Sequence, residues 1–164
     1  SGFSLIGGDE QNYDAIYLAI HNLVGAGVAP YKIADLEWGG QGQWGGSTVE
    51  SSPPKEQWNI SWREDAKHVI ILFSDEEGQT YLTPGITESI LVNMINAADE
   101  LALYAFTASF LIEFALMNNY DALTQAGIGG KLYPLTMKAI TMYNNLLEIL
   151  DETACGGKSG KSSP

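Results

Sequence analysis

The most restrictive feature of this sequence is the run His-Val-Ile-Ile-Leu-Phe-Ser-Asp at residues 68–75. Residues 69–73 are all apolar and rich in β-branched side chains, and an acidic stretch ending in glycine follows them. Apolar runs without alternation are typical of parallel strands that are covered on both faces. We therefore expect a buried strand over 69–73, with Asp75 at its carboxyl end.

Helical and extended patterns alternate along the rest of the chain. Apolar side chains at helical spacing predict helices over 14–24, 86–98 and 137–153, and residues 101–106 have the pattern of a second buried strand. The segment "GIGGKLYPLT" predicts a turn and a further strand. Alternating strands and helices imply an α/β fold, with a doubly wound, mostly parallel sheet and helices on both faces.

Local signals suggest where the helices begin and which faces they bury. Asn12 or Asp14 is a candidate cap for the first helix, and Thr83 with Pro84 is a candidate start for the second. The closing helix is predicted to bury one apolar face, made of Ala139, Tyr143, Leu146, Leu147 and Leu150.

The length of 164 residues suits one domain. Residues 28–61 lack clear periodicity and are rich in glycine, proline and tryptophan, so we interpret them as a long surface insertion, with Trp58 and Trp62 holding it onto the sheet. Residues 155–164 are expected to form a flexible tail, which contains the single cysteine, Cys155.

The net charge of −12 argues against nucleic acid as a partner, because no basic stripe is present to neutralise phosphates. The same charge fits either an ordinary soluble protein or one that binds cations. No apolar run reaches the ~18 residues needed to span a membrane.

Acidic residues follow glycines or strands at two places. In open α/β sheets, ligands bind beyond the carboxyl ends of the strands, which is where Asp75 is expected. Asp9 and Glu10 follow two glycines and precede the first helix, so they could face the same crevice. Glu10 and Asp75 could supply oxygen ligands to Mg²⁺ or Ca²⁺, although hydroxyl ligands must come from elsewhere. Helix capping and compensation of the helix dipole are the structural alternative.

The two histidines, His21 and His68, have no second histidine or cysteine spaced for zinc, and we expect both to be structural.

The segments "GGDEQNYDAIYLAIHNL", "WREDAKHVIILFSDEEG" and "GIGGKLYPLT", in this order, resemble the von Willebrand factor A domain, and most closely the I-like domain of integrin β chains. The resemblance covers most of residues 5–153 apart from the insertion. It implies a metal-ion-dependent adhesion site in which Glu10 matches the ligand of the second loop and Asp75 the aspartate of the third. A free position on the ion would then accept a carboxylate from a partner protein.

One departure from the family is large, because its first strand, which ends in D-x-S-x-S, has no counterpart here. We therefore expect residues 1–154 to be a partial domain that lacks its first strands, with the amino-terminal remainder of the same domain as a partner. The resemblance implies a non-enzymatic adhesion or protein-binding module at the cell surface or outside the cell. Two alternatives remain open: a metal-free assembly domain, and an α/β enzyme that uses Asp75 and Glu10 as acid and base.

Overall fold

The computed structural model describes residues 11–24, 27–38, 60–75, 78–107 and 114–154, with only the backbone described for 114–119. Asp9, Glu10, Trp58 and Cys155 therefore lie outside the described residues, as do most of the insertion and the whole predicted tail.

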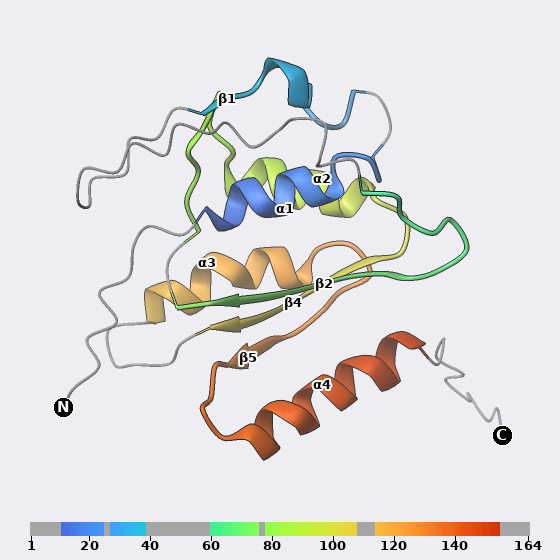
Figure 1. The fold of residues 1–164 in the computed structure, drawn as a ribbon, viewed down its shortest axis with the longest axis vertical. Coiled ribbons are helices and arrows are strands. Elements are labelled where there is room, and N and C mark those ends of the chain that lie inside the picture. Colours follow the sequence, from blue (N-terminus) through green and yellow to red (C-terminus); the bar gives the residue numbers. More distant parts are fainter. Residues whose placement is uncertain (1–10, 25–26, 39–59, 76–77, 108–113, 155–164) are drawn as a thin grey trace, which may run out of the picture.

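Three parallel strands form the main sheet of the described chain (Figure 1). They are β2 (His68–Ser74), β4 (Leu101–Thr107) and β5 (Leu132–Pro134), in the spatial order β2-β4-β5. β2 and β4 pair along their whole length, so that Ser74 lies opposite Thr107 at the carboxyl end.

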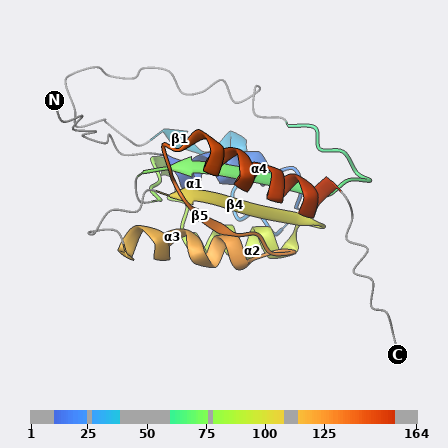
Figure 2. The same cartoon turned by 90° about the horizontal axis from the view of Figure 1, so that it is seen from below.

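Helices cover both faces of this sheet. α1 (Asn12–Ile20), α2 (Glu88–Ala97) and α3 (Phe114–Gln125) lie on one side, and α4 (Ala139–Ala154) lies on the other (Figures 1 and 2). The expected α/β class, with parallel strands between helices, is therefore confirmed in this coarse form.

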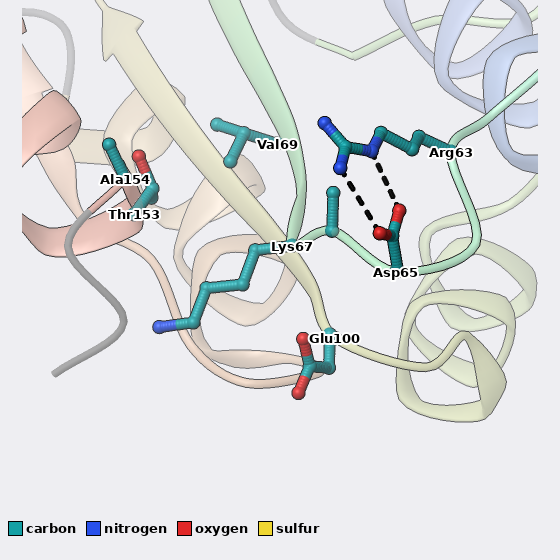
Figure 3. A pocket seen from close by; sticks show the side chains of 8 residues that line it. Arg63, Asp65, Lys67, Val69, Glu100, Thr153 and Ala154 are labelled. Carbon is teal, nitrogen blue, oxygen red and sulfur yellow. Dashed lines mark hydrogen bonds and ion pairs between the residues drawn. The ribbon is translucent and has the colours of Figure 1, made fainter.

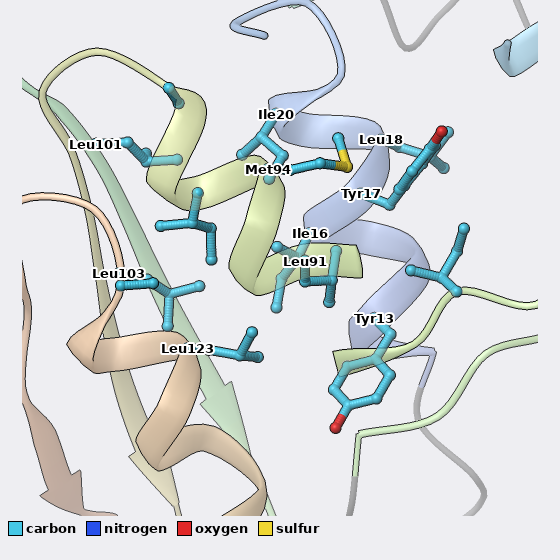
Figure 4. Close-up of a cluster of buried hydrophobic side chains, with 14 of the residues drawn as sticks. Tyr13, Ile16, Tyr17, Leu18, Ile20, Leu91, Met94, Leu101, Leu103 and Leu123 are labelled. Carbon is cyan, nitrogen blue, oxygen red and sulfur yellow. The ribbon is translucent and has the colours of Figure 1, made fainter. Parts of the chain in front are cut away.

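The larger hydrophobic core lies between the sheet and the three helices on its first side. Residues from α1 and α2 meet side chains of β4 there, and Tyr17, Leu91 and Leu103 are fully buried (Figure 4). A smaller core on the α4 side contains Phe106 and Ile149. The strands are thus held between two apolar layers, and their carboxyl ends form one edge of the molecule.

The predicted helix starts need correction. No side chain caps α1, which begins at Asn12 after the N-cap residue Gln11. The first residue before α2 is Thr87, whose hydroxyl accepts a hydrogen bond from the Ile90 N–H at 3.3 Å, whereas Thr83 lies in the short strand β3 (Leu82–Thr83). Thr87 caps the helix because a side-chain oxygen three residues upstream can satisfy a free N–H of the first turn.

The prediction that β2 is buried on both faces was wrong for the described structure. Ile71 is 38% exposed and Phe73 is 47% exposed, whereas every residue of β4 is buried. The physical reason is position, because β2 has β4 on one side and no other described strand pairs with it.

The predicted buried face of α4 is confirmed only at Leu146, which packs on the smaller core together with Met142 and Ile149. Tyr143, Leu147 and Leu150 were predicted to be buried but are exposed. The helix carries two apolar stripes, and the sheet covers only one of them.

The described part of the predicted insertion packs closely on the domain. Leu36 is buried in the larger core, and β1 (Glu37–Trp38) pairs antiparallel with β3. The Trp62 indole N–H donates to the Ala19 carbonyl of α1 at 2.9 Å, so this tryptophan fastens the chain to a helix.

Candidate functional site at the carboxyl end of the sheet

The carboxyl end of β2 is joined to the start of α1 by a buried group of polar side chains. The Asn12 amide donates to the Ser74 hydroxyl at 2.8 Å and to the Tyr120 hydroxyl at 2.9 Å. All three residues are at most 9% exposed. Buried polar groups of this kind hold one geometry, because a lost partner leaves an unsatisfied group away from water. Asp75, which directly follows Ser74, is therefore placed beside the first turn of α1.

The chain after Asp75 is fastened to the same turn of α1. The Tyr13 N–H donates to the Gln79 carbonyl at 3.2 Å. Gly78 lies so close to the Tyr13 ring that an added Cβ would fall 2.0 Å from its Cε1 atom, which only glycine avoids. The first turn of α1 thus contacts the chain on both sides of Asp75.

Asp14 completes this attachment with its carboxylate. One oxygen accepts from the Thr80 hydroxyl at 2.6 Å, and the other accepts from the N–H groups of Tyr81 at 2.7 Å and Leu82 at 3.2 Å. Asp14 is only 2% exposed. Hydrogen bonds to backbone N–H groups stabilise a buried carboxylate, so this aspartate holds the loop that follows Asp75 and does not act as a helix cap.

Thr107 adds a polar group at this end of the sheet. It lies in register with Ser74, and its buried hydroxyl has no hydrogen-bond partner in the described structure. A buried hydroxyl without a partner is destabilising, typically by about 1–3 kcal/mol.

The structure describes only one of the three candidate metal ligands. Asp75 is described and half-buried, whereas Asp9 and Glu10 precede the described residues. Within the described ranges, no group of three or more His, Cys, Asp or Glu side chains is arranged to hold a metal ion. A complete cation site at Asp75 therefore requires ligands from other parts of the polypeptide.

Both histidines contact backbone carbonyl groups. The ring nitrogens of His68 lie 3.0 Å from the Asp99 carbonyl oxygen and 2.9 Å from that of Arg63. His21 Nε2 lies 3.1 Å from the Tyr31 carbonyl oxygen. These contacts hold the connecting segments onto β2 and α1.

A separate cavity of about 530 Å³ lies at the opposite, amino-terminal end of the strands (Figure 3). Lys67, Val69 and Glu100 line it together with Thr153 at the end of α4. One side is closed by an ion pair in which Arg63 Nε lies 2.6 Å from Asp65 Oδ1. Because ligands of open α/β sheets bind at the carboxyl ends, we do not place the site here.

The sequence prediction missed the residues that build the attachment. Their sequence context predicts no more than helix capping for Asn12 and Asp14, and it predicts no role for Ser74, Thr107 or Tyr120. One signal was present, because polar residues at 74 and 75 interrupt an apolar run at its carboxyl end. The pairing of Asn12 with Tyr120, across 108 positions of sequence, leaves no local signal.

Comparison with protein-family models, with curated proteins and with solved structures finds no match for this chain. Among the described helices, none combines the length and apolar character needed to cross a bilayer.

Proposed function

We propose that this chain forms part of a divalent-cation-dependent protein-binding module of the von Willebrand factor A kind. Glu10 and Asp75 are the proposed ligands of Mg²⁺ or Ca²⁺, with Asp9, which directly precedes Glu10, as a further candidate ligand. The observation that supports this proposal is the attachment of the first turn of α1 to Ser74 and Gln79, on both sides of Asp75.

Chain length makes the convergence of Glu10 and Asp75 feasible. Glu10 precedes Asn12 by two residues, and two residues span at most about 7 Å. Asn12 in turn is hydrogen-bonded to Ser74, the neighbour of Asp75. Two carboxylates that meet at one sheet edge would match the preference of hard divalent cations for oxygen ligands from separate segments.

The net charge of −12 supports a cation-binding role, because the field of an acidic protein raises the local concentration of cations. In the proposed function, the ion keeps one position free for a carboxylate of a partner protein. Further ligands come from the remainder of the same domain, in agreement with the resemblance. The role is binding without turnover, at the cell surface or outside the cell.

The affinity of the chain for Mn²⁺, used as a probe for the Mg²⁺ site, tests this proposal. We expect Asp75→Asn to weaken Mn²⁺ binding by about tenfold, since it removes a charged oxygen ligand. Asp151→Asn is the matched control, because it removes the same charge from an exposed position of α4. The control is expected to change binding less than about twofold, as a distant charge is screened. Equal effects of the two variants would contradict the proposal.

A further inference from the structure

α4 carries a second apolar stripe on the side that faces away from the sheet. Its members are Ile140, Tyr143, Leu147 and Leu150, and each of them is between 40% and 67% exposed. With about 3.6 residues per turn, Ile140 and Leu147 lie on the side of the helix opposite Ile149, which is buried in the smaller core. A contiguous apolar surface on a folded domain marks a site of interaction.

The spacing of this outer stripe is that of a coiled-coil helix. Its successive members are separated by three, four and three residues, and Ala154 continues the repeat after four more. Apolar residues at this seven-residue repeat form a straight seam, with which the side chains of a second helix interlock. The outer stripe therefore has the pattern that a partner helix requires.

α4 is held in place by its other face, so the outer stripe is presented by a fixed helix. α4 is the only described helix on its side of the sheet (Figure 2). Ile149 packs in the smaller core, Glu152 accepts a hydrogen bond from the Tyr104 hydroxyl at 3.0 Å, and Glu148 forms an ion pair with Lys131. A surface that is ordered before binding loses little conformational entropy when a partner docks on it.

The charges beside the outer stripe favour a basic partner. α4 contains three acidic side chains and neither lysine nor arginine. Asp151 lies one turn after Leu147, at the border of the stripe, and forms no ion pair with any described residue. Charged residues that flank a coiled-coil seam determine which helix pairs with it. The net charge of −12 also attracts a basic partner toward the chain.

We propose that the outer stripe of α4 binds an amphipathic helix of a partner protein. The apolar seam of that helix packs on Ile140, Tyr143, Leu147 and Leu150, and a lysine or arginine on its flank pairs with Asp151. This surface is separate from the proposed cation site, because α4 and α1 lie on opposite sides of the sheet (Figures 1 and 2). The inference therefore does not depend on the proposed function.

Other occupants fit the outer stripe less well. A second copy of the chain carries the same net charge of −12, and like charges of this size oppose self-association. A bilayer surface favours helices whose polar face is rich in lysine and arginine, which α4 lacks. Residues 155–164 of this chain contain no leucine, isoleucine, valine, methionine or aromatic side chain that could fill the seam.

The experiment uses two synthetic helices as probes of the full chain. The basic probe is three repeats of Ile-Ala-Ala-Leu-Lys-Gln-Lys, and the acidic probe has glutamate in place of each lysine, so both carry the same apolar seam. Binding is measured by fluorescence anisotropy of the labelled probe in EDTA, which removes any contribution from divalent cations. We expect the basic probe to bind about tenfold more tightly than the acidic probe, because electrostatic complementarity selects the partner.

Substitutions on α4 locate the bound probe. Leu150→Ala and Tyr143→Ala should each weaken binding of the basic probe by about tenfold, because each removes apolar area from the seam. The matched control is Ile128→Ala, since Ile128 is 50% exposed in the turn before β5, outside the stripe, and its effect should stay below about twofold. Asp151→Lys should weaken the basic probe and strengthen the acidic probe, because it reverses the charge at the border of the stripe.

Urea unfolding of each variant shows whether the fold is intact, and the two alanine variants on α4 serve as independent tests. Any of five results would overturn the inference: no binding of either probe, equal affinity for both probes, or equal effects of Leu150→Ala and Ile128→Ala. The other two are a dimer of the free chain that Leu150→Ala abolishes, and binding to phosphatidylserine-containing vesicles that the same variant abolishes. The dimer would identify a second copy as the occupant, and the vesicle result would identify a membrane.

Discussion

At the residue scale, single buried polar side chains determine where Asp75 lies. Asp14 is the clearest case, because its two carboxylate oxygens together accept three hydrogen bonds from residues 80–82. Helix propensity does not explain an aspartate at this position, since its carboxylate does not bond to its own helix in the first turn. Its contribution is to tie a loop to a helix across 66 positions of sequence.

Asp14→Asn tests this role. The amide keeps the shape of the carboxylate but replaces one acceptor oxygen with a donor and removes the charge, so we expect a loss of about 2–3 kcal/mol in the free energy of unfolding. Urea unfolding measures the change. Asp35→Asn, at an exposed position, should stay within about 0.5 kcal/mol. Similar losses in both variants would show that Asp14 acts only through its charge.

The raised pKa values of two buried tyrosines lead us to expect a lower free energy of unfolding at high pH. Burial, followed by the hydrogen bond to Glu152, raises the pKa of Tyr104 to about 12. Burial, followed by the negative charges of Glu148 and Glu152, raises the pKa of Tyr133 to about 12. Below the ordinary pKa of 10.0, both states keep these protons. Between about pH 10 and 12 only the unfolded chain loses them, so the free energy of unfolding falls as the pH rises.

The measurement is urea unfolding in steps across this window, with Tyr104→Phe as the comparison. The variant lacks one of the two ionising groups, so its stability should fall less steeply with pH. Parallel slopes for the two proteins would contradict the assigned pKa of Tyr104.

At the element scale, the length and type of β2, β4 and α4 follow from their sequences, and so does the burial of β4. The exposure of one face of β2 and the choice of the buried face of α4 do not. Periodicity identified a closing helix over 137–153, and α4 covers 139–154. Periodicity alone does not distinguish the buried stripe of the helix from the exposed one, because both repeat at helical spacing. The buried stripe contains Ile149 and Leu146, which pack with Phe106 and Tyr133 of the sheet.

This assignment of faces can be tested with two neighbouring residues of α4. Ile149→Ala should lower the free energy of unfolding by about 2–4 kcal/mol, because it opens a cavity in the smaller core. Leu150→Ala should cost less than about 1 kcal/mol in the isolated chain, since Leu150 is 56% exposed. Thermal or urea unfolding compares the two variants. A larger effect at Leu150 would mean that the buried face is the one first predicted from the sequence.

At the scale of the whole molecule, the alternation of strands and helices was sufficient to predict an α/β fold and to place Asp75 at the end of a strand. The position of the first turn of α1 against that strand was not predictable, because it depends on Asn12, Ser74 and Tyr120 meeting from three distant segments. Local patterns specify elements, whereas the site arises from contacts between them. β2 shows the same limit, because its continuous apolar run is typical of a strand with a neighbour on each side, whereas β4 is the only described strand that pairs with it.

We propose that a divalent cation binds at the carboxyl end of β2, beside α1. The most direct measurement is the paramagnetic broadening of assigned amide NMR signals during addition of Mn²⁺ to the full chain, because broadening reports weak binding by distance from the ion. We predict that the signals of Asn12, Asp75 and Thr107 broaden first and that Asp75→Asn removes this effect. Broadening centred on Glu100 and Glu152, at the other end of the strands, would show that the ion binds away from Asp75.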